Sequence, residues 1–349
     1  MRGEYKIPGG KLVTADLEVV DGNLSGVQIA GDFFLEPAEA LPEICKALNG
    51  LPMTASVSDI TSAIKAGVPP ETQFIGFTMD SVAIALRRAL GVAKTWRDYE
   101  WQIIDREPLP PAMHLAIDDV LAKEVAAGRR APTLRFWEWD RPAIIIGSFQ
   151  SLQNEVDVEA AEGHGITTVR RVTGGGAMFV EPGAALTYSL YAPGDLVADM
   201  TFADSYEFLD GWVLAALNGL GVDAFYKPLN DISSSKGKIG GAAQKRYHGG
   251  AVLHHATMAY DMDAVKMMQV LRIGREKLSD KGTASAAKRV DPVRSQTQME
   301  RLDVKAHMKQ TFLDLHGGTD GAITAEEMAA AEELASGKFS SKDWLEYIP

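Results

Sequence analysis

The chain of 349 residues contains a single cysteine, Cys45, so an internal disulfide bond is impossible. This composition fits a reducing compartment. No apolar run approaches the ~18 residues that span a bilayer, and the first residues, Met1-Arg2-Gly3-Glu4-Tyr5-Lys6, lack the hydrophobic stretch of a signal peptide. We therefore expect a cytoplasmic protein that makes no membrane contact.

Positive charge is scarce, since 35 lysine and arginine residues stand against 47 acidic residues and the net charge is −12. This balance argues against binding to nucleic acid or to anionic lipid. The exception is the stretch 224–250, where five basic residues accompany one acid, Asp231. Positive charge concentrated beside glycines in an acidic protein favours a small anion as the ligand.

Several common catalytic signatures are missing. The chain has no G-x-x-x-x-G-K-[ST] loop, no complete G-x-G-x-x-G, no G-x-S-x-G and no H-E-x-x-H. P-loop hydrolases, Rossmann dehydrogenases and α/β-hydrolases therefore lose their main support. His254 and His255 are adjacent on a predicted strand and so point to opposite faces, which favours packed or hydrogen-bonded histidines over a histidine metal site.

Two segments combine glycine with positive charge. The first is Arg170-Arg171-Val172-Thr173-Gly174-Gly175-Gly176, and the second joins Asn230-Asp231-Ile232 to Lys238-Ile239-Gly240-Gly241-Ala242. Glycines let backbone N–H groups approach a ligand because no Cβ is in the way. Arginine and lysine supply the charge that a phosphate or carboxylate needs. Together the segments predict an anion-binding site, and the alternative is a glycine-rich hairpin turn beside a solvated basic loop.

Length and periodicity predict two units, with ~150 residues per domain as a guide. The first 93 residues show a hairpin around Asp21-Gly22-Asn23 and then three helical patterns, which predicts a small α+β module. In the remainder, Ala143–Ile146 predicts a strand buried on both faces, and Leu186–Leu190 predicts a strand with one solvated or ligand-facing side. The other elements expected are helices at 36–48, 58–66, 81–90, up to 128 and 202–220, and strands at 134–139, 239–246 and 251–260.

These motifs, in this order, resemble the catalytic domain of lipoate–protein ligases within the biotin/lipoate ligase superfamily. The first unit resembles the small accessory domain of these ligases through Gly3-Glu4-Tyr5-Lys6-Ile7-Pro8-Gly9-Gly10-Lys11 and Gly31-Asp32-Phe33-Phe34. The resemblance implies an α+β fold with a mixed or antiparallel sheet and flanking helices. It also implies an accessory domain at 1–93 and a catalytic domain with a C-terminal helical tail at 94–349. The matching catalytic segments are 134–139, 147–150 with Glu155-Val156, 170–179, 230–231, 238–242, 254–257 and 277–290.

Such ligases join lipoate to ATP to form lipoyl-AMP and then pass the acyl group to a lysine of a lipoyl carrier. The resemblance therefore implies lipoate or octanoate, ATP and Mg²⁺ as ligands. The implied partner is the E2 component of a 2-oxoacid dehydrogenase, the glycine cleavage H protein or a similar carrier. Lys238 matches the family's essential lysine, whose ammonium would hold the carboxylate and the α-phosphate together. The implied substrate- and nucleotide-binding residues are Arg171, Thr173, Gly174, Gly175, Gly176, Ala177, Met178, Phe179, Asn230, Asp231, Gly241, Ala242 and His255.

Asn230 and Asp231 would hold Mg²⁺ or orient Lys238, because the phosphates of ATP need a hard cation with oxygen ligands. A plain turn role is the alternative for Asp231. Arg170 is expected to pair with a core acid or to contact the ligand. Candidates for an apolar tunnel around the acyl chain are three large residues that could equally belong to the core: Phe149, Met178 and Phe179.

The chain departs from the family pattern, because Val180-Glu181 and Ala184 stand where many members have His-Asp and Asn. This leaves the acyl preference and the acceptor open. Octanoyltransferases share the fold but use a cysteine thioester, and Cys45 lies in the first unit. Biotin ligases lose support because their Gly-Arg-Gly-Arg loop is missing. The sequence favours an ATP-dependent lipoate–protein ligase, with an octanoyl or lipoyl transferase or a non-catalytic lipoate- or carrier-binding homologue as alternatives.

Overall fold

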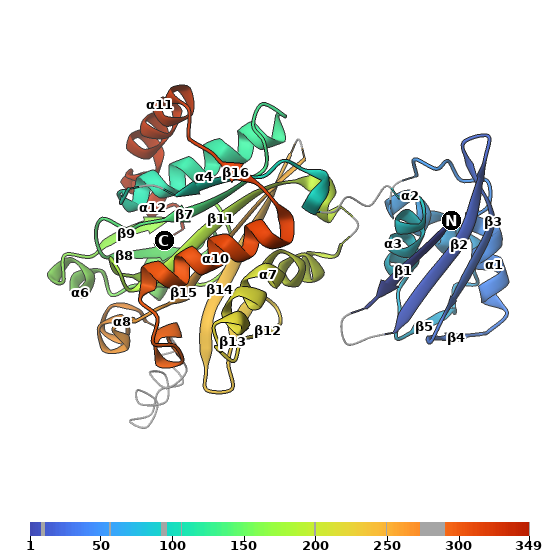
Figure 1. Cartoon of the computed structure of the whole chain (residues 1–349), viewed down its shortest axis with the longest axis horizontal. Coiled ribbons are helices and arrows are strands. Elements are labelled where there is room, and N and C mark those ends of the chain that lie inside the picture. Colours follow the sequence, from blue (N-terminus) through green and yellow to red (C-terminus); the bar gives the residue numbers. More distant parts are fainter. Residues whose placement is uncertain are drawn as a thin grey trace. The chain divides into compact units, whose positions relative to one another are not determined.

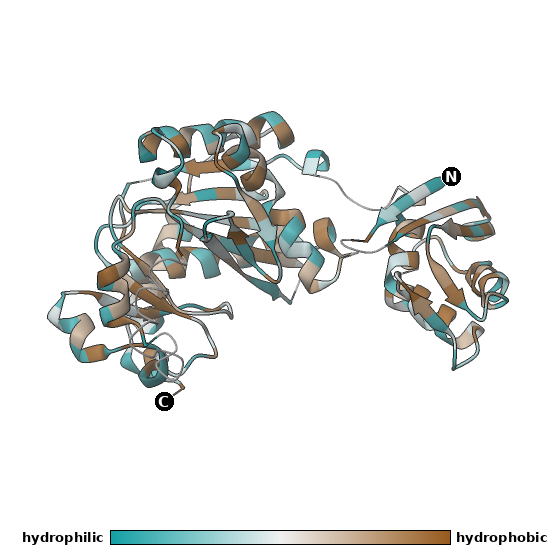
Figure 2. Ribbon diagram, turned by 90° about the horizontal axis from the view of Figure 1, so that it is seen from below, coloured by the Kyte–Doolittle hydropathy of each residue, from teal (hydrophilic) through white to brown (hydrophobic). Residues whose placement is uncertain are grey.

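The computed structural model describes all residues except 8–10, 56, 92–95, 106, 199, 249, 273–289 and 349. The described chain forms two compact units (Figure 1). The first comprises Met1–Thr95 and Asp195–Asp204, and the second comprises Trp96–Gly194 and Ser205–Pro349. Each unit has a hydrophobic core of its own, and in both the helices alternate between hydrophobic and hydrophilic residues (Figure 2).

The first unit is a three-stranded antiparallel sheet, in the order β1-β2-β3, packed against helices. Asp21 and Gly22 join β2 to β3 with φ of 50° and 78°, and this left-handed turn confirms the predicted hairpin. Helix α1 buries one apolar stripe of Ala40, Ile44 and Leu48, as its predicted periodicity requires, whereas α3 is buried continuously from Ser81 to Leu86. The elements are β1 (Arg2–Lys6), β2 (Leu12–Val20), β3 (Asn23–Gly31), β4 (Phe34–Glu36), α1 (Ala40–Leu48), α2 (Val57–Gly67), β5 (Gln73–Ile75) and α3 (Met79–Ala89).

The second unit is built on an eight-stranded mixed sheet of order β12-β13-β14-β15-β11-β7-β6-β16. Its pairs are antiparallel from β12 to β7 and parallel where β6 meets β7 and β16. This arrangement confirms the α+β class with a mixed sheet. The strands are β6 (Gln102–Asp105), β7 (Thr133–Trp137), β11 (Ala185–Pro193), β12 (Phe225–Lys227), β13 (Asp231–Ser233), β14 (Lys238–Tyr247), β15 (Ala251–Ala259) and β16 (Thr319–Asp320).

The central strand β11 is buried on both faces, whereas its alternating sequence predicted a solvated or ligand-facing side. Its polar residues meet buried indoles instead: Trp137 donates to Ser189 Oγ at 2.9 Å, and Trp139 donates to Thr187 Oγ1 at 3.2 Å. Thr187 also lines a cavity, so this strand borders a pocket at that position. A strand buried on both faces can thus alternate apolar and polar residues, a pattern that usually indicates a solvated face, when its polar side chains form hydrogen bonds inside the core.

A smaller sheet of order β10-β8-β9 accompanies the large one. Its strands are β8 (Ala143–Ile146), β9 (Thr167–Arg170) and β10 (Met178–Val180). All four residues of β8 are buried, which confirms the prediction of a strand covered on both faces. Residues 147–150 follow β8 directly, and the triple glycine connects β9 to β10.

Helices cover both faces of the large sheet (Figure 1). Helix α4 packs on β11 and β15 on one face, whereas Trp212 of α7 contacts Tyr188 on the other. The helices are α4 (Pro111–Ala126), α5 (Leu152–Glu155), α6 (Val158–Gly163), α7 (Phe202–Gly219), α8 (Ala264–Val270), α10 (Arg301–His316), α11 (Ala325–Leu334) and α12 (Lys342–Leu345). Short turns of helix are η1 (Trp96–Asp98), η2 (Gly194–Val197), η4 (Val293–Ser295) and η5 (Ala335–Phe339).

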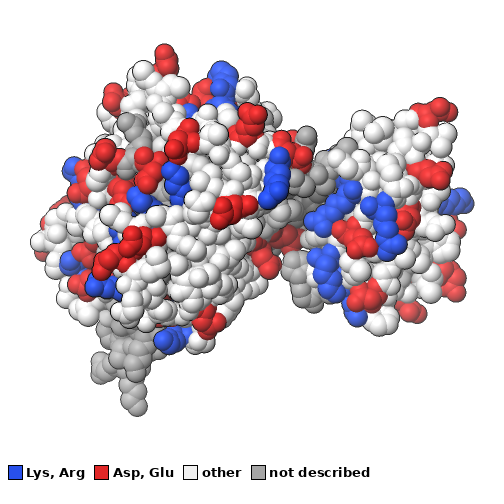
Figure 3. All heavy atoms as spheres, viewed as in Figure 1, with Lys and Arg blue, Asp and Glu red and all other residues white. Residues whose placement is uncertain are grey.

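Among the described residues, no helix is both long enough and apolar enough to cross a membrane. On the face shown in Figure 3, acidic and basic side chains are interspersed over both units. The charge of the chain is therefore distributed as small clusters of both signs on this face.

The buried ion pair between Arg130 and Glu327 gives a test of how the C-terminal helices are attached. Arg130 Nη1 lies 2.6 Å from Glu327 Oε2, and the two side chains are 4% and 10% exposed. Arg130→Met leaves an uncompensated buried carboxylate, and we expect it to cost about 3–5 kcal/mol of unfolding free energy. Arg129→Met is the matched control, because its partner Glu124 is partly exposed and such pairs contribute about 0–1 kcal/mol. Denaturant unfolding should separate the variants, and equal losses would contradict this account.

Candidate active site

The second unit contains a cavity of about 810 Å³, within the usual range of small-molecule sites. Strand β10, the β13–β14 hairpin and the central strands β11 and β15 contribute its walls. The predicted site residues that line it are Arg171, Gly176, Ala177, Met178, Phe179, Asn230, Asp231, Lys238, Gly241, Ala242 and His255. Thr173, Gly174 and Gly175 are not among the lining residues; they precede the strand as a turn.

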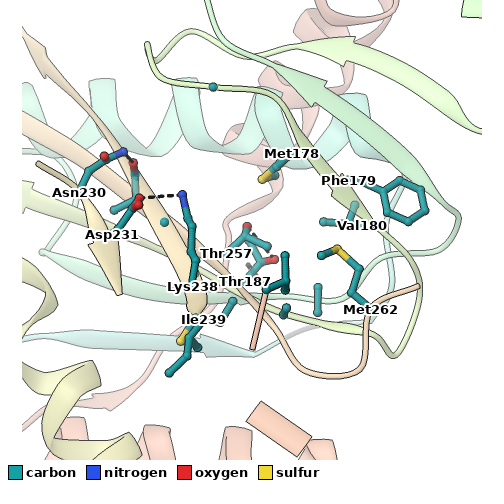
Figure 4. A pocket seen from close by; sticks show the side chains of 18 of the residues that line it. Met178, Phe179, Val180, Thr187, Asn230, Asp231, Lys238, Ile239, Thr257 and Met262 are labelled. Carbon is teal, nitrogen blue, oxygen red and sulfur yellow. Dashed lines mark hydrogen bonds and ion pairs between the residues drawn. The ribbon is translucent and has the colours of Figure 1, made fainter. Parts of the chain in front are cut away.

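Lys238, the first residue of β14, extends into this cavity. Its ammonium lies 2.6 Å from Asp231 Oδ1 on the neighbouring strand, and the side chains point toward each other (Figure 4). The Lys238 side chain is 48% exposed, so a ligand entering the cavity can reach it. Its backbone is held by Asp291, whose N–H donates to Lys238 O at 2.8 Å. The cation is therefore anchored by its main chain and oriented by an anion.

Gly241 provides the space that this ion pair occupies. It lies directly opposite Asp231 in the β13–β14 pairing, and a Cβ on it would lie 3.0 Å from Lys238 Nζ. Asn230 holds the start of β13 against β14. Its side-chain Nδ2 donates to Ala242 O at 2.7 Å, and its main-chain carbonyl accepts from Ala242 N at 2.9 Å. The Asn-Asp pair and the glycines thus serve one local geometry. Asp231 is a strand residue bound to a lysine, and the alternative of a plain turn residue fails.

Arg171 shapes the glycine turn. Its guanidinium donates to Gly174 O at 2.7 Å, to Gly176 O at 2.8 Å and to Ile145 O at 3.1 Å. The residue is 4% exposed, and burial lowers its pKa to about 10. Gly175 has φ of +89°, which only glycine adopts readily, and a Cβ there would lie 3.0 Å from the guanidinium. The arginine therefore reaches the cavity wall while its donors hold backbone carbonyls.

His255 connects the cavity to a buried polar network that the sequence did not reveal. Its Nδ1 lies 2.7 Å from Asp118 Oδ2, and its Nε2 lies 2.7 Å from Thr173 Oγ1. Burial lowers the pKa of His255, although Asp118 acts in the opposite direction. A neutral ring that donates to Asp118 accepts from Thr173, and this fixes the threonine at the start of the glycine turn.

Asp118 is the centre of this network and is 1% exposed. It accepts hydrogen bonds from Arg135 Nη2, Ser189 Oγ and Tyr191 OH at 2.6–2.8 Å. Burial opposes its ionisation, but the hydrogen bonds from His255 and Tyr191 and the charge of Arg135 together lower the pKa of this carboxyl. A charged carboxylate with this many donors is a rigid support, so β11, β15 and α4 are tied together behind the cavity. His254 points the other way and lies 2.8 Å from Asp210, as the prediction of packed histidines requires.

The remaining half of the cavity is apolar, and Met178, Phe179, Val180 and Met262 lie across from Lys238 (Figure 4). Met267 and Leu271 pack with Phe179 in this wall, whereas Met258 lines the cavity from β15, opposite Gly240. The prediction for Met178 and Phe179 therefore holds as far as their position is concerned. Phe149 was expected beside them and is 79% exposed, outside the lining. That expectation was wrong: the Phe149 ring lies against Gly174, where a Cβ would be 3.7 Å away.

The departures from the family pattern also line the cavity. Val180 and Ala184 add apolar surface, and Glu181 forms an ion pair with Lys266 of α8 at 2.5 Å. The hydrogen bond from Lys266 to Glu181 raises the pKa of the lysine. The carboxylate at this position is therefore neutralised within the wall. The matching segment at 277–290 lies outside the described residues except for Val290, which lines the cavity.

No group of three His, Cys, Asp or Glu side chains in the described part of the chain could hold a metal ion by itself. Mg²⁺ in nucleotide sites, however, uses one or two carboxylates together with phosphate oxygens. Asp231 supplies one such carboxylate beside the amide of Asn230. The residues present fit a magnesium ion that arrives with a phosphate ligand.

The site is one cavity in which the Lys238–Asp231 pair faces an apolar wall. The chain matches the lipoyl protein ligase A/B catalytic domain over residues 110–313, and it belongs to this family. Lipoate-protein ligase A subunit 1 of Thermoplasma acidophilum is 32% identical over 244 residues, or 66% of this chain and 90% of that protein. Octanoyltransferase LipM of Geobacillus kaustophilus is 27% identical over 273 residues, or 70% and 97%. The family thus comprises enzymes of protein lipoylation whose names divide between ligase and octanoyltransferase.

Solved structures agree with the fold. A bi-partite lipoate protein ligase of Thermoplasma acidophilum, described with its E2 lipoyl domain, superposes with a TM-score of 0.65 at 31% identity, covering 72% of this chain and 98% of that one. Lipoate-protein ligase A bound with ATP gives 0.62 at 27%, with coverage of 72% and 99%. A Thermoplasma acidophilum structure with bound lipoic acid gives 0.62 at 27%, with coverage of 72% and 100%.

The network behind the cavity makes stability depend on pH through His114. Burial and the neighbouring Arg135 lower the pKa of His114 to about 3. Its Nδ1 accepts from Arg135 Nη1 at 3.0 Å, so protonation there would place two cations together. Below pH 6.5, near the ordinary histidine pKa, His114 is protonated in the unfolded chain but stays neutral in the folded chain. The free energy of unfolding therefore falls by about 1.4 kcal/mol for each unit by which the pH is lowered.

We therefore expect the free energy of unfolding to decrease between pH 6.5 and pH 5, above the range where carboxylates titrate. His114→Gln keeps one donor and one acceptor but cannot titrate, so it should flatten this slope by roughly 1 kcal/mol per pH unit. Denaturant unfolding at several pH values measures the effect. Parallel curves for the variant and the native chain would show that His114 does not carry the dependence.

Proposed function

We propose that this protein is an ATP-dependent lipoate–protein ligase, which activates lipoate or octanoate as an acyl-adenylate and transfers the acyl group to a lysine of a lipoyl carrier. The observation that carries this proposal is the Lys238–Asp231 pair at the boundary between the polar and apolar halves of one cavity. A fatty carboxylate bound with its chain in the apolar half brings its head group to this cation.

Adenylation needs a carboxylate and an α-phosphate in contact, although both are negative. The Lys238 ammonium has three donors and can bind one oxygen of each reactant, which orients the attack and stabilises the developing charge. Asp231 would then release or share the ammonium when the anions enter. Because its carboxylate holds the lysine near the ligand beforehand, little reorganisation is needed during the reaction.

The nucleotide is assigned to the polar half, along the backbone of Gly176, Ala177 and Met178. Arg171 holds this backbone through Gly174 O and Gly176 O. Asp231 and Asn230 would hold Mg²⁺ together with the phosphates, and the ion would neutralise phosphate charge. Relatives described as bound with ATP and with lipoic acid support both ligands.

Octanoyl transfer from a carrier is the second candidate, favoured by relatives named octanoyltransferase LipM. That route forms a thioester, so a cysteine must lie beside the acyl chain. The only cysteine of the chain, Cys45, is in α1 of the first unit, and residues 96–349 contain none. The absence of a thiol from the cavity supports direct transfer from the adenylate.

A lipoyl-carrier domain is the proposed acceptor, in line with a relative described together with its E2 lipoyl domain. The segment 1–95 of the first unit precedes the family match, which begins at residue 110. We assign it the role of the ligase accessory domain, on the strength of its Gly3–Lys11 and Gly31–Phe34 motifs. Residues 8–10 of the first motif lie outside the described residues.

Lys238→Ala is the direct test of the proposed mechanism. We expect lipoate-dependent ATP–pyrophosphate exchange to fall about 100- to 1,000-fold, the usual effect of removing one donor aimed at transition-state charge. Lys245→Ala is the matched control, because Lys245 lies on the same strand outside the cavity lining. Exchange with lipoate supports the ligase, whereas transfer only from an octanoyl carrier would support the transferase. Binding of lipoate without either reaction would identify a non-catalytic homologue.

Deletion of residues 1–93 tests the assignment of the first unit. If the first unit is the accessory domain that adenylation requires, its deletion should abolish adenylation. Some transfer from preformed lipoyl-AMP should persist, because Lys238 and the cavity belong to the second unit. Both half-reactions can be followed separately, with circular dichroism as the control for folding. Full exchange activity in a folded truncated protein would exclude a required role for the first unit.

A further inference from the structure

We propose that Arg170 and the C-terminal segment 341–348 form a positioning device for the glycine turn, a role that rests on the ligase function proposed above. Sequence places Lys338–Trp344 in a segment that the catalytic mechanism does not use. The structure brings this segment to the back of the cavity wall, where it contacts β9. The end of the described chain thereby becomes part of the support of the active site.

Arg170, the last residue of β9, is fully buried and was expected to pair with an acid or to contact the ligand. It does neither in the described chain, since its bonds go to backbone carbonyls and it is not among the lining residues. A buried guanidinium must have acceptors for its five N–H groups. It finds them in two segments that are far apart in sequence.

One half of the guanidinium binds the loop after β8. Arg170 Nη1 donates to Gln150 O at 2.5 Å, to Gly147 O at 3.1 Å and to Ser148 O at 3.3 Å. Three carbonyls of one short loop therefore converge on one nitrogen. The loop conformation depends on the position of that nitrogen.

The other half binds the C-terminal segment. Arg170 Nη2 donates to Leu345 O at 2.7 Å and to Ile348 O at 3.3 Å, and Nε donates to Trp344 O at 3.1 Å. In return, Trp344 Nε1 donates to the main-chain carbonyl of Arg170 at 2.8 Å. The segment thus holds both the side chain and the backbone of the arginine.

The loop transmits this position to the glycine turn. Ser148 N–H donates to Thr173 O at 2.8 Å, and Gly147 packs so closely that a Cβ on it would lie 2.2 Å from Gly175 O. Arg171 holds the same turn from the cavity side. Two consecutive arginines therefore clamp the turn, one directly and one through the 147–150 loop.

The C-terminal segment is anchored independently of Arg170. Ser341 caps α12 by accepting from Trp344 N–H at 3.2 Å, and the Lys338 ammonium lies 4.2 Å from the Trp344 ring centroid. Phe339 is 1% exposed in the core that α4 shares with α11. A segment fixed in this way can impose a position on Arg170 rather than merely follow it.

The experiment compares three proteins: the full chain, a chain ending at Ser340, and Trp344→Phe. In lipoate-dependent exchange we expect the KM for ATP to rise roughly 10- to 100-fold on truncation and several-fold in Trp344→Phe, with a smaller change in kcat, because the glycine backbone that lies against the nucleotide is displaced. A synthetic peptide of residues 341–349 added to the truncated chain should restore part of the affinity.

Trp101→Phe is the matched control. It removes the same kind of bond, from a buried indole N–H to Trp96 O at 2.8 Å, at a position outside the cavity. We expect its KM for ATP to stay within about two-fold of the native value, even where its thermal stability falls as much as that of Trp344→Phe. An equal rise in KM for both variants would reduce the effect to general destabilisation and overturn the proposal.

A second readout does not depend on catalysis. Hydrogen exchange of the Ser148 amide, which donates to Thr173 O, should accelerate in the truncated chain and in Trp344→Phe, but not in Trp101→Phe. Unchanged exchange together with an unchanged KM would refute the positioning role. If the full chain shows no lipoate-dependent reaction, the ligase function fails while amide exchange still decides the structural part. If the truncated chain does not fold, Trp344→Phe decides both measurements.

Discussion

The ion pair between Lys238 and Asp231 is the interaction on which the site depends. An ammonium beside an apolar chamber needs an anion to stay in place, and it must still be accessible to a ligand. Adjacent strands satisfy both needs, because β13 presents the carboxylate and β14 presents the lysine at 2.6 Å. Gly241 has no side chain and so leaves room for the ion pair, and Asn230 holds the two strands together by donating to Ala242 O. The ion pair is therefore formed within one hairpin, and Asp291 supports it from outside by donating to the main-chain carbonyl of Lys238.

Behind this hairpin, buried charge is handled in two different ways. Asp118 and Arg135 neutralise each other and recruit hydroxyl and imidazole groups, which ties strands to a helix. Arg170 and Arg171 bind carbonyls instead, and so they order backbone that has no regular hydrogen bonds of its own. Guanidinium groups suit this second task because their donors spread over a plane and reach several acceptors at once. Arg171 thus holds the irregular glycine turn through Gly174 O and Gly176 O.

Sequence patterns predicted much of this molecule, and the failures have physical causes. The strand Ala143–Ile146, the hairpin at Asp21-Gly22 and the convergence of Lys238 with Asp231 followed from local composition and from the resemblance to a family. The network around Asp118 could not be predicted, because its members come from α4, β7, β11 and β15 and no local pattern links them. The same holds for the bonds of Arg170 to residues 344–348, which depend on tertiary packing alone. Phe149 was misplaced because hydrophobicity does not report which way a loop turns.

The methionines of the chamber have a consequence for what it can hold. Met178, Met258, Met262 and Met267 line the cavity, and none of them is branched. Unbranched thioether side chains change rotamer at little cost and have polarisable sulfur atoms, so such a wall adapts its shape without backbone movement. Apolar groups of different shapes can therefore be enclosed by the same set of side chains.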